Sequence, residues 1–136
     1  MAAMLPRLWF KDFSSTSFAI RGNDSKPIAF LVGYISQEDP GKGYVHFIGV
    51  DPRNRNEGLG RALYEAFARR AFDLGARRIE AVTSPINRDS LIFHESLGFM
   101  AKQLDGSLAQ PTQATSRRDF DGQGEDRVLL ARTLPF

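Results

Sequence analysis

One strand-to-helix connection constrains the fold of this chain more than any other part of its sequence. The connection reads VDPRNRNEGLGRAL and places Gly58 and Gly60 between an apolar run and a long amphipathic pattern. Three arginines stand close to these glycines: Arg53, Arg55 and Arg61. Two interpretations are open: an ordinary polar turn, or a helix that begins around a bound anion.

Apolar periodicity along the 136 residues predicts alternating strands and helices. The predicted helices lie at about 5–13, 59–74 and 88–97, and the predicted strands lie within 17–36 (two, joined at 22–24) and at 44–50, 78–83, 98–104 and 127–134. Asn87 is predicted to cap the third helix, and Gly75 and Gly98 are predicted to end the second and third. Residues 105–125 are rich in turn-forming residues and show no period. This order predicts a single α+β domain over 1–136, with helices packed on a mixed sheet.

The composition excludes several classes of protein. A chain without cysteine has no disulfide, thiolate metal site or cysteine nucleophile. His46 and His94 are its two histidines, so we expect no metal cofactor. The formal charge of +2 gives no support to nucleic-acid binding. No apolar run reaches the ~20 residues of a membrane helix, and residues 1–13 lack a signal-peptide core, so a cytoplasmic protein is predicted.

Known phosphate-binding loops test the anion interpretation of the glycine turn. A Walker loop requires Lys-Ser or Lys-Thr after its last glycine, and neither follows here. A dinucleotide fingerprint requires a third glycine where Leu63 stands. What remains is R-x-x-G-x-G from Arg55 to Gly60, at a helix start where backbone N–H groups lack partners and the helix dipole is positive. These features favour a diphosphate, and a solvated helix start stays open as the alternative.

Two motifs resemble those of the GNAT-type N-acetyltransferase superfamily. The pattern V-x-P-x-x-R-x-x-G-x-G-x-x-L, which begins at Val50 and ends at Leu63, resembles its acetyl-CoA motif. NRDSLIFHESLGF, residues 87–99, resembles its next motif, N-x-x-[SA]-x-x-[FL]-Y-x-x-x-G-F. The resemblance covers about residues 15–134. It implies a GNAT-like fold, in which a central mixed, mostly antiparallel sheet has a splayed parallel pair and flanking helices.

The resemblance implies acetyl-CoA as the co-substrate and assigns residues to each part of it. The coenzyme diphosphate is expected to lie against the glycine turn, on Arg55, Asn56, Glu57, Gly58, Leu59, Gly60 and Arg61. The pantetheine arm is expected to extend like an added strand, bonded to the main chain of Ile48 and Val50. Asn87 is expected to contact this arm. Three further side chains are expected to project toward the thioester: Ser90, Phe93 and His94.

The same resemblance makes His94 a candidate catalytic acid. Many members of the family have a tyrosine four residues before the glycine of the second motif, where it protonates the departing thiolate. Counted back from Gly98, this position holds His94, and an imidazole can donate a proton near neutral pH. The alternative is that His94 packs in the interior and that solvent protonates the thiolate.

His46 is the candidate general base for the attacking amine. Strand alternation predicts four side chains on one face: Tyr44, His46, Ile48 and Val50. A bulge near Gly49 would shift this register. The family often presents its base, or a base that acts through water, from this strand. The alternative is a half-buried structural histidine. Asp51 has the opposite parity and is expected to cap the turn.

The N-terminal region departs from the family pattern. The family usually begins with a strand followed by two helices, whereas one predicted helix precedes the strand at SFAI, so an N-terminally shortened domain is predicted. The missing elements would leave a strand edge and apolar surface exposed, which predicts a homodimer.

The combined prediction is an enzyme that transfers acetyl from acetyl-CoA to a primary amine by direct attack in a ternary complex. Its expected acceptor is a small-molecule or peptide amine, and neither nucleic acid nor membrane is an expected partner. The alternative is a catalytically weak or inactive module that senses acyl-CoA. The identity of the amine stays open.

Overall fold

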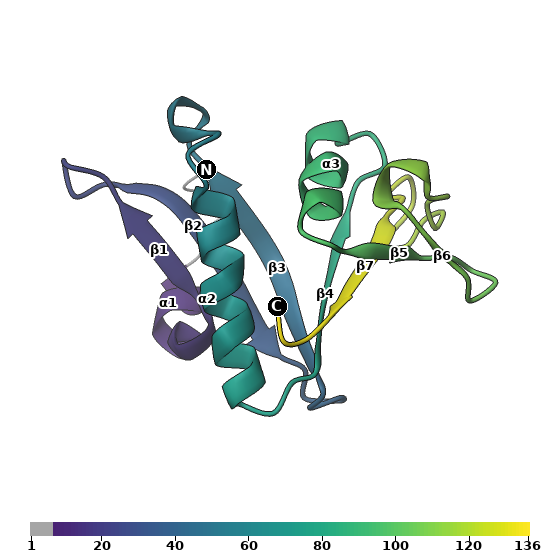
Figure 1. Ribbon diagram of the computed structural model, residues 1–136, viewed down its shortest axis with the longest axis horizontal. Helices are drawn as coiled ribbons and strands as arrows, with labels where there is room; N and C mark the ends of the chain where they lie inside the picture. Colours follow the sequence, from purple (N-terminus) through teal and green to yellow (C-terminus); the bar gives the residue numbers. More distant parts are fainter. Residues whose placement is uncertain (1–6) are drawn as a thin grey trace. The chain divides into compact units, whose positions relative to one another are not determined.

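A computed structural model of the chain describes residues 7–136. The chain comprises two compact units: one takes Met1–Ile79 with Leu134–Phe136, and the other takes Glu80–Thr133. Both units combine helices with strands (Figure 1), which confirms the predicted α+β class. Strand β4, Arg78–Thr83, begins in the first unit and continues into the second. The single domain over 1–136 stays a prediction.

Three neighbouring strands that pair antiparallel form the base of the first unit. These strands are β1 (Phe18–Arg21), β2 (Pro27–Ile35) and β3 (Lys42–Val50), in the order β1–β2–β3. The predicted hairpin between β1 and β2 is confirmed, and across its turn the Gly22 N–H donates to the Lys26 carbonyl at 2.9 Å. Strand β3 begins before the predicted position, because Ser36 N–H bonds the Lys42 carbonyl and extends the ladder.

Helix α2, Leu59–Asp73, packs along one face of this sheet (Figure 1). Its Phe67 ring is fully buried and lies over Gly33 of β2 and Gly43 of β3. Because these positions carry no side chain, the helix can approach both strands closely. The helix is followed by Gly75, whose φ of 106° confirms the predicted left-handed end.

Helix α1, Arg7–Asp12, packs on the opposite face of the same sheet. Its Trp9 forms a buried cluster with Phe30 and Val32, which alternate along β2 with the residues that face α2. The predicted helix over 5–13 is confirmed for the described residues, and Leu5 lies outside them. The two helices therefore place the core of this unit on both sides of β2.

Replacing Gly33 with alanine is expected to destabilise the protein by about 1–3 kcal/mol. A Cβ atom there would lie 2.7 Å from the Phe67 ring and 2.7 Å from the Tyr44 carbonyl oxygen, and a backbone atom in a paired strand cannot move aside cheaply. The free energy of unfolding in urea measures the effect. Gly41→Ala is the matched control, because its nearest neighbour is the Asp39 carboxylate at 3.3 Å, on a movable side chain. Equal stability of the two variants would contradict the prediction.

The second unit contains helix α3 (Arg88–Ser96) and four paired strands. After β4 these strands are β5 (Met100–Lys102), β6 (Leu108–Ala109) and β7 (Val128–Thr133), and β5 pairs antiparallel with both β6 and β7. Residues 105–125 are turn-rich as predicted, and they also contain β6, a strand that is not among the predicted elements because two residues are too few to show alternation. A bridge between Arg117 and Arg127 closes the remainder of this loop.

Candidate functional site

The turn between β3 and α2 is held by Asp51. Its carboxylate accepts a hydrogen bond from the Arg53 N–H at 2.9 Å, which confirms the predicted cap, and it also pairs with the Arg53 guanidinium at 3.2 Å. These hydrogen bonds hold the pKa of the Asp51 carboxyl below its usual range. Arg53 therefore helps to shape the turn. The other two clustered arginines, Arg55 and Arg61, lie nearer to the helix start.

The backbone after this turn bends twice through the left-handed region before α2 begins. Asn56 has a φ of 67° and Gly58, the cap residue, has a φ of 78°. No side chain of the described residues caps α2, and its first turn holds no acidic residue. The Ala62 N–H is bonded to the Gly58 carbonyl at 3.0 Å, so the N–H groups before it lie in the unpaired first turn. This uncapped helix start, with its positive dipole end, can accept an anion.

The predicted diphosphate residues all lie in this stretch and reach solvent. Arg55, Asn56, Glu57, Gly58 and Arg61 are exposed, and Leu59 and Gly60 are half-buried. The Arg61 guanidinium lies 3.9 Å from the Glu65 carboxylate, a spacing that constrains it weakly on an exposed helix. The structure thus brings the seven predicted residues together around one helix start, and their contacts with the coenzyme stay a prediction.

The end of β3 offers main-chain groups on the side away from β2. The Asp51 N–H bonds the Ile28 carbonyl at 2.7 Å, which marks Asp51 and Ile28 as a hydrogen-bonded pair. Because hydrogen-bonded and non-bonded pairs alternate along an antiparallel ladder, Val50 and Ile48 direct their N–H and C=O groups away from β2. This is the orientation that the predicted pantetheine contacts require.

A β-bulge interrupts β3 at His46. Val32 pairs with Phe47 and the next residue of β2, Gly33, pairs with Val45, so His46 is the extra residue. The bulge considered near Gly49 is not found, because Gly49 stays in register opposite Phe30. A bulge follows from how two strands pair, and the β3 sequence alone does not carry that information.

The bulge also overturns the prediction that four alternating residues of β3 share one face. Tyr44 pairs with Tyr34 and lies on the α1 side, whereas Ile48 pairs with Leu31 and lies on the α2 side with Val50. His46 lies on the α1 side, where its ring stacks on Trp9 with centroids 5.0 Å apart. Its side chain is exposed, which contradicts the burial expected for a structural histidine, and its catalytic role stays a prediction.

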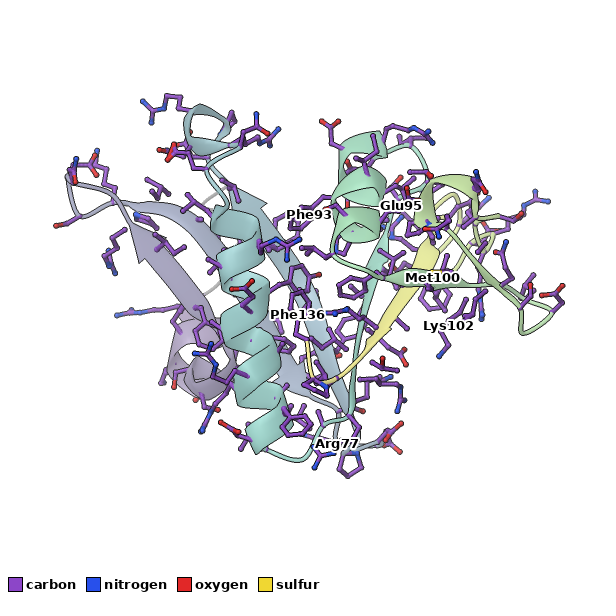
Figure 2. The ribbon with its side chains drawn as sticks, in the orientation of Figure 1. Arg77, Phe93, Glu95, Met100, Lys102 and Phe136 are labelled. Atoms are coloured by element: carbon purple, nitrogen blue, oxygen red, sulfur yellow. The ribbon has the colours of Figure 1, made fainter. Side chains whose placement is uncertain are left out.

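In the second unit, Asn87 caps α3 as predicted. Its side-chain oxygen accepts a hydrogen bond from the Ser90 N–H at 3.1 Å. The Ser90 hydroxyl in turn accepts one from Thr83 at 3.0 Å. On the opposite side of α3 from Phe93 (Figure 2), Glu95 accepts hydrogen bonds from the Thr112 N–H and hydroxyl at 3.2 and 2.7 Å. Helix α3, which carries His94, is therefore held by hydrogen bonds at its start and on the side of Glu95.

His94 is 4% exposed and lies edge-on to the rings of Phe93 and Phe99, with centroids 5.3 and 5.1 Å away. Its Nδ1 lies 2.8 Å from the Ser90 carbonyl oxygen, and this geometry requires Nδ1 to carry a proton and donate it. Burial lowers the pKa of His94, so the ring is neutral near pH 7. Protonation of a thiolate through Nε2 would need a second proton on this ring. The catalytic role of His94 stays a prediction.

Burial of His94 makes the stability of the protein dependent on pH. The unfolded chain takes up a proton at this residue below about pH 6.5, whereas the folded chain does so only at its lowered pKa. Between those two values the unfolded state binds more protons, so stability is expected to fall as the pH drops and to level off below the folded pKa. Urea unfolding from about pH 7.5 to 5 measures this slope. His94→Phe should flatten it, and identical slopes in the two proteins would contradict the prediction.

Neither a membrane-spanning helix nor a metal-binding cluster is found among the described residues. No helix within 7–136 combines the length and apolar character needed to cross a membrane. In the same range, no group of three His, Asp or Glu side chains comes close enough to hold a metal ion. The expected absence of a metal cofactor and of a membrane partner stays a prediction.

Comparison with known sequences identifies the family of this chain. Residues 2–99 match the model of the acetyltransferase (GNAT) family. The L-2,4-diaminobutyric acid acetyltransferase of Streptomyces anulatus is 38% identical over 84 residues, which cover 61% of this chain and 48% of that protein. The aligned part spans about half the length of the first such relatives.

Comparison with solved structures finds the same fold. Nourseothricin acetyltransferase gives a TM-score of 0.72 at 22% identity, covering 88% of this chain and 65% of the other. The NatC complex bound to Gag peptide and CoA gives 0.70 at 18% identity, covering 94% of this chain and 77% of the other. These likenesses confirm the predicted GNAT-like fold.

Proposed function

Because the chain belongs to the acetyltransferase (GNAT) family, we propose that it transfers the acetyl group of acetyl-CoA to a primary amine by direct attack in a ternary complex. The observation that carries this proposal is the uncapped start of α2, which follows the two left-handed residues Asn56 and Gly58. It lies inside the part of the chain that matches the family model.

The first unit supplies the groups that would hold the coenzyme. The N–H groups at the start of α2 would bind the diphosphate, and Arg55 and Arg61 would add charge-assisted hydrogen bonds. The outward main-chain groups of Ile48 and Val50 would pair with the amides of the pantetheine arm, as an added strand does. A bound coenzyme would thus run from the start of α2 along the end of β3.

The chemistry requires a neutral amine and a stabilised leaving group. An ammonium must lose one proton before its nitrogen can attack the thioester carbon. His46 is the proposed base, since it is exposed and lies on β3 about 7 Å along the strand from Ile48. For the acid that protonates the departing thiolate, His94 and solvent both stay as candidates.

The acceptor class is proposed from the relatives. The name of the Streptomyces anulatus relative describes acetylation of L-2,4-diaminobutyric acid, a small molecule with two amines. A small diamino acid is therefore the first acceptor to test on this chain. An N-terminal peptide amine is the second, because one structural neighbour was solved with a peptide and CoA.

Two measurements on the purified protein test the proposal. Calorimetry measures binding of acetyl-CoA, and a thiol-release assay measures turnover over a panel of diamino acids and peptides. Amine-dependent thiol release supports the enzyme. Binding without release for any amine supports instead the acyl-CoA sensor, and absence of binding contradicts both.

A homodimer in the cytoplasm is part of the same proposal. In the second unit, Leu104 and Leu108 are 80% and 61% exposed at the β5–β6 hairpin, and exposed apolar side chains of this kind occur where proteins associate. Light scattering on the eluting protein measures its mass. A monomer mass at the concentration used for the assays would contradict the dimer.

A further inference from the structure

The stack between Trp9 and His46 joins helix α1 to the bulge of β3. The two ring centroids are 5.0 Å apart and the planes differ by 19°. Trp9 is 9% exposed and is anchored from several directions, because it packs on Phe30 and Val32 in the core cluster. A ring held in this way offers a fixed surface to its neighbour.

Two further aromatic rings lie against Trp9, outside the buried contacts with Phe30 and Val32 that anchor it. The ring of Phe13 lies 5.0 Å away at an angle of 42°, and the ring of Tyr34 stacks at 6.2 Å and 18°. Within residues 7–136, His46 stacks on Trp9 and not on either of these two rings. Trp9 is thus the residue that both packs in the buried cluster and contacts the exposed His46 ring.

His46 depends on this contact for its orientation. As the extra residue of the bulge it lies where the β2–β3 ladder is interrupted, so strand pairing constrains its side chain less than its neighbours. Within residues 7–136 no hydrogen bond or ion pair of its ring is found. One ring face rests on Trp9, and both ring nitrogens are left for other partners.

We propose that Trp9 is a positioning residue for the amine-activating base, an inference that rests on the proposed function. By stacking on one face of the His46 ring, Trp9 holds the ring nitrogens toward the acceptor. An ammonium group gives one proton to an imidazole nitrogen, and the freed nitrogen lone pair forms the C–N bond with the acetyl carbon. The C–S bond breaks with its electron pair on the coenzyme sulfur. The acylated nitrogen gives up its second proton, the sulfur takes up one proton, directly from that nitrogen or through solvent, and the imidazolium returns the first proton to solvent.

Substitution of Trp9 by methionine tests the proposal, because methionine fills apolar space without providing a ring face. Trp9→Met is expected to lower kcat about tenfold or more while the Kd for acetyl-CoA changes less than about twofold, since a misplaced base slows only the chemical step. Trp9→Phe keeps a ring and should recover most of the loss. Phe13→Met is the matched control: it removes a ring that contacts Trp9 but not His46, and kcat should stay within about twofold.

A double-mutant cycle separates positioning from general packing. If Trp9 acts through His46, Trp9→Met should cost no further activity in a His46→Gln background. Equal losses in the two backgrounds, or an equal loss from Phe13→Met, would overturn the proposal. If Trp9→Met does not fold, Trp9→Phe takes its place in the cycle. The change in kcat that Trp9→Phe causes is then compared between the protein with His46 and the His46→Gln variant.

A spectroscopic measurement makes the outcome independent of turnover. Stacking on an indole should shift the ring-proton NMR signals of His46 upfield in the wild type, and Trp9→Met should return them toward ordinary values. Unshifted wild-type signals overturn the inference even in an active enzyme. A wild type that shows the shift but releases no thiol with any amine overturns the proposed function and, with it, the positioning role.

Discussion

The Gly60→Trp variant is expected to lose at least about 100-fold in affinity for acetyl-CoA, or about 2.7 kcal/mol. Gly60 is the second residue of α2, inside the first turn whose N–H groups have no intrahelical partner. An indole at this position would stand over those groups and exclude the diphosphate. Calorimetry on the wild type and the variant measures the difference.

A control on the same helix separates this effect from loss of structure. Arg69 is exposed and lies nine residues further along α2, roughly 13 Å from Gly60 along the helix axis. Arg69→Trp should therefore retain wild-type affinity. Circular dichroism should show that both variants are folded. A folded Gly60→Trp protein with unchanged affinity would remove the start of α2 from the coenzyme site.

The features that the sequence predicts well are those that depend on neighbouring residues. The start of α2 after Gly58, the cap of α3 by Asn87 and the turn held by Asp51 each follow from a local backbone or side-chain requirement. The glycine turn belongs to this class, since its chemistry comes from a few consecutive residues. For the same reason the sequence motif alone predicts the candidate coenzyme site.

The features that the sequence does not predict depend on distant partners. The bulge at His46 is set by how β3 pairs with β2, and the stack on Trp9 joins residues far apart in the chain. Strand β6 is formed by two residues whose only signal is their pairing with β5. The proposed base lies among such contacts, so the position of His46 could not be derived from alternation along its own strand.

His46→Gln is expected to lower kcat about 100-fold or more without changing affinity for acetyl-CoA. Glutamine has a polar side chain of similar reach, but its amide cannot accept a proton near neutral pH. The acceptor ammonium would then have to lose its proton to water. Thiol release with the best amine of the panel gives kcat, and calorimetry gives the Kd.

The location of His46 allows a sharper form of this test. Because its side chain is exposed, added imidazole can reach the space left in a His46→Ala variant, and it should restore part of the lost turnover. Tyr44→Phe is the matched control, since Tyr44 lies on the same side of β3 and the change removes only a hydroxyl. If His46→Gln keeps wild-type kcat, the base must lie elsewhere. If His46→Gln and Tyr44→Phe lose activity equally, this face of β3 matters for structure rather than for proton transfer.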